Sequence, residues 1–246
     1  QPDISIIGID DEFCRDYYEK NKHDLKLIPI SGVVLPDGGV GVLDGKLIDT
    51  RRVAGMKEKT ILSLPFHKNL RGPHHAQNMA AAYLIADYYG VSVTDFLSAL
   101  KTFTPLPHRQ EWVAHIAGVD YINDSKATNV DAALKSLCGF QNIRWLAGGA
   151  LKMGDRFFEL AAAASHIKHG YFFGAGARKL QNEVMAYIAS DMFDDLAGAL
   201  SAARRDAQYG DVVLLSPLGA SFDQYKNFEE RGDDFKHRVL AFQNKT

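Results

Sequence analysis

The segment Tyr121-Ile-Asn-Asp-Ser-Lys-Ala-Thr-Asn129 decides how the second half of this chain is interpreted. An apolar run, VDYI, leads directly into a cluster of polar side chains that includes Asp124, Lys126 and Thr128. A buried strand that ends in such a cluster is where an open α/β sheet usually places its ligand site. The alternative is a polar turn in which Asn129 only caps the following helix, VDAALKSL.

Apolar runs alternate with amphipathic segments around and after this cluster. WVAHIAG, VDYIN, IRWLAGG, HGYFFGAG and DVVLLSPLG are predicted strands, whereas NVDAALKSL, FFELAAAAS, ARKLQNEVMAYI and DDLAGALSAARRDA are predicted helices. A last helix is expected from about Asn227 to Phe242. This alternation predicts an α/β fold made of βαβ units on a mainly parallel sheet.

The first hundred residues mix strands and helices. ISIIGI is predicted to be a buried strand, and three short strands with hairpin turns at Asp37-Gly38-Gly39 and Asp44-Gly45 follow it. Helices are predicted over about 74–89 and about 95–101, the first of them opened by Pro73.

TFTPLPHRQ then interrupts the pattern with two prolines. We therefore place a domain boundary near Thr104, which gives domains 1–104 and 105–246.

The composition is that of an ordinary globular protein. The 246 residues carry a net charge of −2 and are 46% hydrophobic, which gives no reason to expect nucleic acid or a membrane as a partner. Cys14 and Cys138 form neither a metal motif nor a disulfide framework, so a cytoplasmic location is the default. The chain begins at Gln1 with a strand following at once, which suggests a piece of a longer protein.

Gly72-Pro-His-His-Ala-Gln-Asn78 stands at the predicted beginning of a helix. Free N–H groups and the positive end of the helix dipole favour an anion there, and His74, His75 and Asn78 add side-chain donors. A solvated first turn is the alternative for this motif taken alone.

Three further segments have the composition of ligand sites. Pro105-Leu-Pro-His-Arg109 places an arginine at the proposed domain boundary, where it could bind a phosphate. Gly148-Gly149-Ala-Leu-Lys152 follows a predicted strand, as does SPLGASFDQYKNFEERG (216–232). With INDSKATN, three of the four candidate segments follow strand ends and should converge on one edge of the sheet. A surface arginine and a plain strand-to-helix turn are the alternatives for the first two.

Two nucleotide-binding patterns are incomplete. Gly174-Ala-Gly176 lies between a strand and a helix, as in a dinucleotide fingerprint, but Lys179 stands where the third glycine belongs. This motif alone supports a nicotinamide-dependent oxidoreductase as an alternative of another class. No segment matches the P-loop pattern Gly-x-x-x-x-Gly-Lys-Ser/Thr.

Taken together, INDSKATN, GG-x-x-K and SP-x-x-ASFDQ-x-x-NFE-x-RG resemble the Mur ligase family, as do GPHHAQN and LPHR. The string SFDQ-x-x-NFE-x-RG is most similar to the branch that adds D-glutamate to UDP-N-acetylmuramoyl-L-alanine. The resemblance implies an ATP- and Mg²⁺-dependent ligase of peptidoglycan synthesis, cytoplasmic and monomeric, that forms an acyl phosphate.

The resemblance also implies a domain organisation. Residues 1–104 would be the carboxyl-terminal part of a central ATP-binding domain, and residues 105–246 would be a Rossmann-like domain that binds the amino acid. The P-loop and most metal ligands would lie upstream, so this piece alone is expected to be inactive. Another Mur ligase, or an enzyme like folylpolyglutamate synthetase, is the alternative within the superfamily.

Roles transfer to the matching positions by resemblance alone. The catalytic residues would be Lys126 and His74. Nucleotide contacts are implied for Asn78, His75, Arg109 and Asp124, and amino-acid contacts for Thr128, Lys152, Ser221, Phe222 and Phe228. His75 departs from the asparagine usual in the family, and Gly219 from a frequent cysteine.

Overall fold

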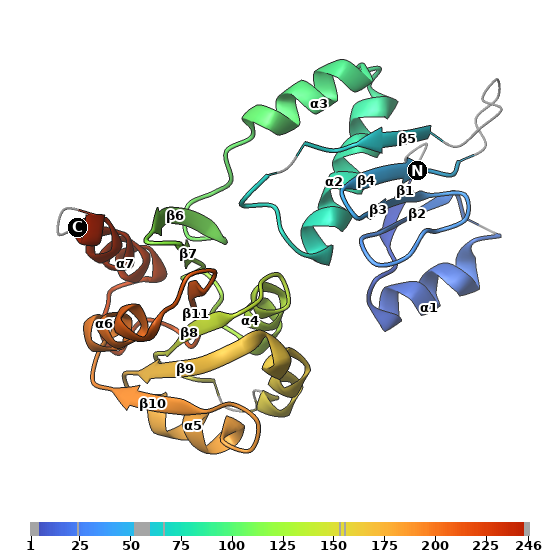
Figure 1. Cartoon of the computed structure of the whole chain (residues 1–246). Helices are drawn as coiled ribbons and strands as arrows, with labels where there is room; N and C mark the ends of the chain where they lie inside the picture. Colours follow the sequence, from blue (N-terminus) through green and yellow to red (C-terminus); the bar gives the residue numbers. More distant parts are fainter. Residues whose placement is uncertain are drawn as a thin grey trace. The chain divides into compact units, whose positions relative to one another are not determined.

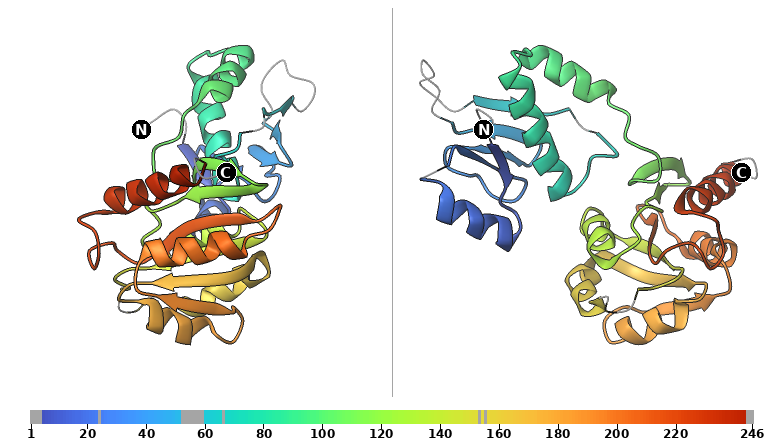
Figure 2. Two further views of the ribbon diagram at one scale, coloured as in Figure 1. Left: turned by 60° about the vertical axis from the view of Figure 1, so that its left-hand side comes forward. Right: turned by 180° about the vertical axis from the view of Figure 1, so that it is seen from behind.

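The structure is a computed structural model that describes residues 5–23, 25–51, 60–65, 67–152, 154 and 156–243. The chain divides into two compact units, Gln1–Thr104 and Pro105–Thr246. Figure 1 shows the helices and strands of each unit, and Figure 2 shows them from two further directions. Among the residues described, no helix is both long enough and apolar enough to cross a membrane.

The first unit is built on a five-stranded sheet in the order β1-β2-β3-β4-β5. Its strands are β1 (Ser5–Gly8), β2 (Leu27–Ser31), β3 (Val40–Leu43), β4 (Lys46–Asp49) and β5 (Thr60–Ser63). Its helices are α1 (Glu12–Asn21), α2 (Pro73–Tyr88) and α3 (Val93–Thr102). Helix α2 begins at the predicted proline and packs against β2 and β3, where Val40, Leu47 and Leu84 lie in the core.

One of the two predicted hairpins is present in this sheet. Strands β3 and β4 are antiparallel, and their turn places Asp44 and Gly45 at φ 49° and 71°. The hairpin predicted at Asp37–Gly39 is wrong, because β2 and β3 are parallel. Residues 32–39 instead return the chain toward β2, where a Cβ on Gly39 would fall 2.0 Å from the Pro29 carbonyl oxygen.

The second unit is built on a six-stranded sheet in the order β10-β9-β8-β11-β7-β6. The strands are β6 (Glu111–Ile116), β7 (Val119–Asn123), β8 (Ile143–Gly148), β9 (Ile167–Phe173), β10 (Ser190–Phe193) and β11 (Val212–Leu218). The helices are α4 (Val130–Leu137), the 3₁₀ helix η1 (Phe157–His166), α5 (Ala177–Val184), α6 (Leu196–Asp206) and α7 (Phe228–Gln243). This is the mainly parallel α/β sheet that the sequence predicts, with only β6 paired antiparallel.

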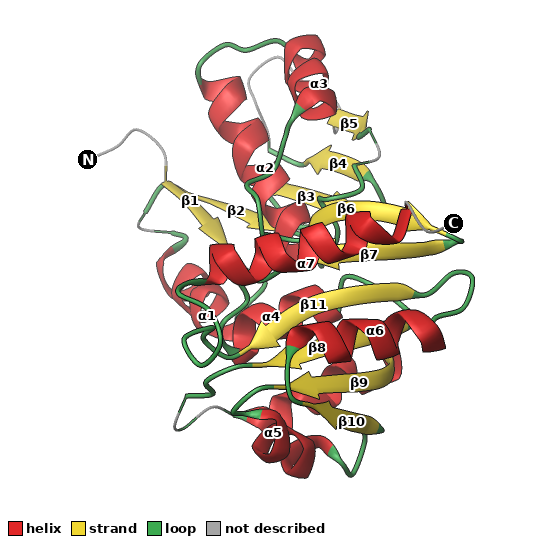
Figure 3. Cartoon of the chain, turned by 90° about the vertical axis from the view of Figure 1, so that its left-hand side faces the viewer, coloured by secondary structure: helices red, strands yellow, loops and turns green. Residues whose placement is uncertain are grey.

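Helices cover both faces of this sheet. Helices α6 and α7 lie in front of the strands in Figure 3, whereas α4 lies behind them. The core under α4, η1 and α5 centres on Trp145, Leu160 and Phe172, and the core under α6 and α7 on Tyr171 and Phe235. The strands therefore read as continuous apolar runs, because both of their faces are buried.

Some elements differ from the sequence prediction. The helix predicted at FFELAAAAS is present and is of the 3₁₀ type (η1), whereas the short edge strand β10 was not predicted. Helix α1, which contains Cys14, was not predicted either. Its sequence, EFCRDYYEKN, is mostly polar, and none of its residues is buried. The other cysteine, Cys138, forms the C-cap of α4 in the second unit.

A buried carboxylate joins three neighbouring strands at the edge of the second sheet opposite the polar loops. Asp211 precedes β11 and accepts hydrogen bonds from Arg144 Nε of β8 (2.9 Å) and Lys168 Nζ of β9 (2.5 Å). Burial alone would raise the pKa of Asp211, but these two cations and the Gln208 N–H hold it below its ordinary value. The ionised form therefore stabilises the fold.

We expect Asp211→Asn to lower the free energy of unfolding of the second unit by about 2–3 kcal/mol at neutral pH, since it leaves two cations without their carboxylate. Because the folded pKa is lowered, this difference should shrink as the pH falls through it. Urea unfolding followed by fluorescence measures it, as both tryptophans, Trp112 and Trp145, lie in this unit. Asp191→Asn, which removes an exposed partner of His169, is the control and should change little.

Candidate ligand site at the carboxyl edge of the second sheet

Three of the five predicted segments meet at one edge of the second sheet. Strands β7, β11 and β8 are adjacent and parallel, so their carboxyl ends lie side by side. The loops after these ends carry INDSKATN, SPLGASFDQ and GGALK. Strand β11 is inserted between β7 and β8, which makes this the position where the strand order changes and where open α/β sheets bind ligands.

The carboxylate of Asp124 is buried just beyond β7, with 6% of the residue exposed. It accepts hydrogen bonds from the Gln110 N–H (3.1 Å) and from the hydroxyl of Ser136 on α4. Burial raises its pKa to about 7, against the opposing effect of these donors and of the Arg109 charge. A carboxylate has about four lone-pair positions, so it retains acceptor capacity for a ligand.

Arg109 stands on a turn that the buried groups hold in place. Its neighbours His108 and Gln110 have φ values of 62° and 47° and are both buried, whereas Arg109 is exposed. His108 bonds the Asn123 side chain (3.0 Å), and its carbonyl accepts the Lys126 N–H (3.1 Å). The guanidinium is thus presented to solvent from a fixed backbone.

Lys126 lies against an aromatic ring. Its Nζ is 4.0 Å from the centroid of Phe228, the first residue of α7. The Phe228 carbonyl accepts the hydroxyl of Ser125 at 2.7 Å, so the ring position is tied to the end of β7. Thr128 is half-buried in the same loop, and Asn129 caps α4 by accepting the Ala132 N–H (2.8 Å). The capping alternative therefore holds for Asn129.

The loops after β8 and β11 are joined backbone to backbone. Ala150 and Ala220 exchange two hydrogen bonds of 2.8 and 2.9 Å, which places the segments containing Lys152 and Ser221 next to each other. Ser221 is buried, whereas Lys152 is exposed and Phe222 is 75% exposed. Lys152 and Phe222, which are both expected to contact one ligand, are therefore exposed on paired loops.

Arg231 of α7 is fully buried beneath these loops. Its guanidinium donates to the Ser125 hydroxyl (3.0 Å), the Ser125 carbonyl (2.9 Å) and the Gly219 carbonyl (3.1 Å). Burial lowers its pKa to about 10, and the charge of Asp223 opposes that shift. Arg231 lies within the predicted segment 216–232, but no role was predicted for it from the sequence.

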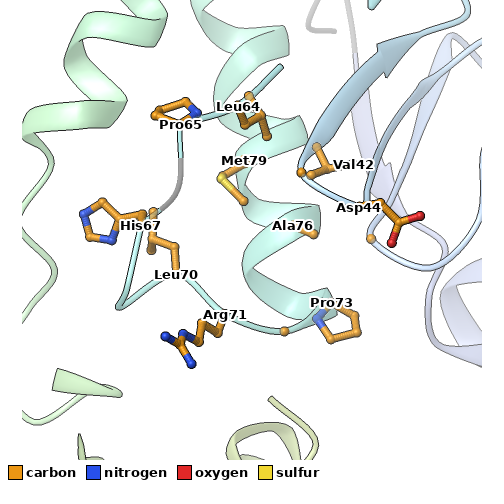
Figure 4. Close-up of a pocket in the computed structure, with 13 residues that line it drawn as sticks. Val42, Asp44, Leu64, Pro65, His67, Leu70, Arg71, Pro73, Ala76 and Met79 are labelled. Atoms are coloured by element: carbon orange, nitrogen blue, oxygen red, sulfur yellow. The ribbon is translucent and has the colours of Figure 1, made fainter. Parts of the chain in front are cut away.

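The residues predicted in the first unit lie in the first turns of α2. His74 and His75 are half-buried with ring centroids 4.2 Å apart, and Asn78 is exposed. A pocket of about 380 Å³ lies beside this helix (Figure 4). Helix α2 contributes Pro73, Ala76 and Met79 to its lining, so among the residues described the three predicted ones lie off the pocket.

The Gly174-Ala-Gly176 turn has its glycines for a reason internal to the protein. A Cβ on Gly174 would fall 2.4 Å from Asp223 Oδ2, and a Cβ on Gly176 would fall 2.5 Å from the Gly149 carbonyl oxygen. The loops after β11 and β8 therefore occupy the space that a dinucleotide pyrophosphate would need. This packing argues against the oxidoreductase alternative.

Comparison with known proteins agrees with this architecture. Residues 108–219 match the model of the Mur ligase glutamate ligase domain. The chain is thus similar to Mur ligases over nearly its whole length.

Among its relatives are UDP-N-acetylmuramoylalanine--D-glutamate ligases of two bacteria. The Rhodospirillum rubrum enzyme is 37% identical over 97% of this chain and 50% of its own length, and that of Jannaschia sp. 38% identical over 99% and 53%. The chain thus spans about half the length of these relatives.

Solved structures share the fold at lower identity. The MurF ligase of Thermotoga maritima in complex with ADP gives a TM-score of 0.60 at 16% identity, covering 98% of this chain and 55% of its own. The bifunctional folylpolyglutamate synthase/dihydrofolate synthase of Yersinia pestis gives 0.57 at 18%, covering 94% and 50%.

We expect Asp124→Asn to gain stability relative to the wild type as the pH rises from about 4 to 7. The raised folded pKa means that the wild-type carboxyl keeps its proton after the unfolded chain has lost it, so stability falls across this window. The difference should reach on the order of 2–4 kcal/mol. Urea unfolding at several pH values, followed by tryptophan fluorescence, measures it. A constant offset between the two proteins would contradict the assignment to Asp124.

Proposed function

We propose that this chain is part of an ATP-dependent ligase that joins D-glutamate to UDP-N-acetylmuramoyl-L-alanine in the cytoplasmic stage of peptidoglycan synthesis. The names of the relatives support this proposal, because both sequences match over nearly the whole of this chain. Residues 1–104 would be the back part of the central ATP-binding domain and 105–246 the amino-acid-binding domain. We expect a monomer that needs the remaining half of the protein for turnover.

The observation that carries the proposal is the pairing of Ala150 with Ala220. It joins a loop that ends in Lys152 to one that contains Ser221 and Phe222, beside the β7 loop with Lys126. An amino acid with two carboxylates needs cations and donors on a rigid rim, and these loops supply both. We assign the D-glutamate pocket to Thr128, Lys152, Ser221, Phe222 and Phe228.

The proposed chemistry proceeds through an acyl phosphate. The γ-phosphoryl group of ATP passes to the substrate carboxylate, the D-glutamate amine attacks the acyl carbon, and phosphate leaves. Negative charge builds on the transferring phosphoryl and acyl oxygens, and fixed cations stabilise it. We assign Lys126 to this charge and Arg109 to the nucleotide phosphates.

The remaining nucleotide contacts are proposed by position in the family motifs. Asp124 would bond the ribose through its remaining lone pairs, Asn78 and His75 would contact the adenine side, and His74 would lie near the reacting groups. Mg²⁺ would neutralise phosphate charge. No group of three His, Cys, Asp or Glu side chains in the described part of the chain is arranged to hold a metal. We therefore assign no ligand and no step to the metal within these residues.

Calorimetric titration of ADP into this chain tests the nucleotide assignment. We expect weak binding that falls about tenfold in Asn78→Ala, in line with the loss of one hydrogen bond to the ligand, and no heat from NADH. Binding of NADH instead of ADP would revive the oxidoreductase alternative. ADP binding that is unchanged in Asn78→Ala would remove the adenine contact from α2.

We expect Lys152→Ala to weaken D-glutamate binding about tenfold and to leave ADP binding unchanged, because Lys152 would pair with a substrate carboxylate. Amide chemical shifts of the labelled chain, titrated with D-glutamate, measure this, and L-glutamate serves as the stereochemical control. Lys179→Ala removes the same charge from α5, where Nζ lies over the Phe157 ring, and should leave both affinities unchanged. Equal losses for ADP and D-glutamate would contradict the role of Lys152.

A further inference from the structure

The loop after β11 carries an acidic residue whose carboxylate is bound by the protein itself. Asp223 Oδ2 accepts the N–H of Ala175 at 3.0 Å, across the turn that follows β9. Gly174 of that turn has φ 70°, and a Cβ there would fall 2.4 Å from the same oxygen. Only a glycine lets the carboxylate approach the turn this closely.

The position of this carboxylate is that of a bound anion. The turn leads directly into α5, whose amino-terminal N–H groups and dipole favour negative charge. In a nucleotide-binding sheet, the ligand's phosphate would lie at such a turn. In this protein, Asp223 supplies the negative charge from within the chain. Its hydrogen bond to Ala175 links the loop after β11 to the loop after β9, and we call it the Asp223–Ala175 link.

The Asp223–Ala175 link lies next to the segment proposed to bind the amino acid and holds it in place. On its amino-terminal side, Ala220 is paired with Ala150 by two backbone hydrogen bonds. On its carboxyl-terminal side, Asp223 is bound to Ala175, and the neighbouring Gln224 side chain donates to the Asp194 carbonyl at 2.6 Å.

The two residues between these attachments are Ser221 and the largely exposed Phe222. The Ser221 carbonyl also accepts the N–H groups of Gln224 (3.1 Å) and Tyr225 (2.8 Å), which closes the turn behind it. The backbone of the proposed pocket is therefore fixed from both sides before any ligand arrives, and pre-organisation of this kind raises affinity.

We propose that Asp223 is a positioning residue of the amino-acid site: its carboxylate, bound to the Ala175 N–H, fixes the Ser221–Phe222 segment and thereby sets the affinity for the substrate carboxylate without touching the substrate. This inference rests on the proposed function for the identity of the ligand. The Asp223–Ala175 link itself rests on the hydrogen bond between the two residues and on the close approach of Asp223 to Gly174.

The test uses the ¹⁵N-labelled chain and two readouts, amide hydrogen exchange and D-glutamate titration. We expect Asp223→Ala to speed amide exchange at Ala175 about tenfold, because the variant loses one charge-assisted hydrogen bond. We also expect it to weaken D-glutamate binding about five- to tenfold. Asp223→Asn keeps an acceptor oxygen, so its exchange rate and its D-glutamate affinity should lie between those of the wild type and those of Asp223→Ala. Glu183→Ala, which removes an exposed carboxylate from α5, is the matched control and should change neither readout.

Chemical rescue separates positioning from a general loss of structure. Formate fits the space left in Asp223→Ala and should restore both the protection of Ala175 and the D-glutamate affinity, whereas chloride at equal ionic strength should not. Unchanged exchange at Ala175 in Asp223→Ala would show that the Asp223–Ala175 link does not fix the turn. Faster exchange with unchanged D-glutamate affinity would overturn the positioning role.

Failure of the proposed function gives a different pattern. If the wild type does not respond to D-glutamate, the ligand assignment fails, and exchange at the Tyr225 amide, which donates to the Ser221 carbonyl, decides the positioning role. Faster exchange there in Asp223→Ala, reversed by formate, supports the inference. Equal exchange in the two proteins refutes it.

Discussion

The buried guanidinium of Arg231 is the constraint on which the carboxyl edge of the second sheet depends. Removing a cation from water costs several kcal/mol, so the group is tolerated only because its donors are satisfied. It reaches the carbonyl and hydroxyl of Ser125 after β7 and the carbonyl of Gly219 after β11, from a backbone that belongs to α7. The helix that carries Phe228 is therefore attached to both loops, and the ring beneath Lys126 is placed by the same interaction.

Close backbone approach explains the glycines of this edge better than a cofactor does. Gly149 meets the Ala220 carbonyl, Gly174 meets Asp223, and Gly176 meets the Gly149 carbonyl, each within a distance that a Cβ would not permit. The three loops form one interlocked layer above the sheet. Such a layer presents Lys152 and Phe222 from a rigid support, which is what recognition of a small, charged ligand requires.

The sequence was sufficient for the features that local patterning controls. The parallel sheet of the second unit follows from its apolar runs, and the beginning of α2 follows from Pro73. The sequence was insufficient where residues far apart in the chain determine strand pairing and burial. Asp-Gly-Gly signals a turn but not the parallel partner of β2, and nothing near Asp124 indicates that Ser136 and Gln110 will bury it. Helix α1 is mostly polar and buries no side chain, so the sequence signal for a packed helix is weak there. The INDSKATN segment was located correctly at a strand end, but the roles of its residues came from motif resemblance and stay proposals.

The two cysteines are divided between the units, Cys14 in α1 of the first and Cys138 at the end of α4 of the second. Each is the single thiol of its unit, since the chain contains two cysteines in all. The native sequence therefore already contains a pair of attachment points for spin labels or fluorophores. Pulsed electron resonance or energy transfer between labels at these thiols would read out the separation of the two units in solution, with and without nucleotide, in a protein whose sequence has not been altered.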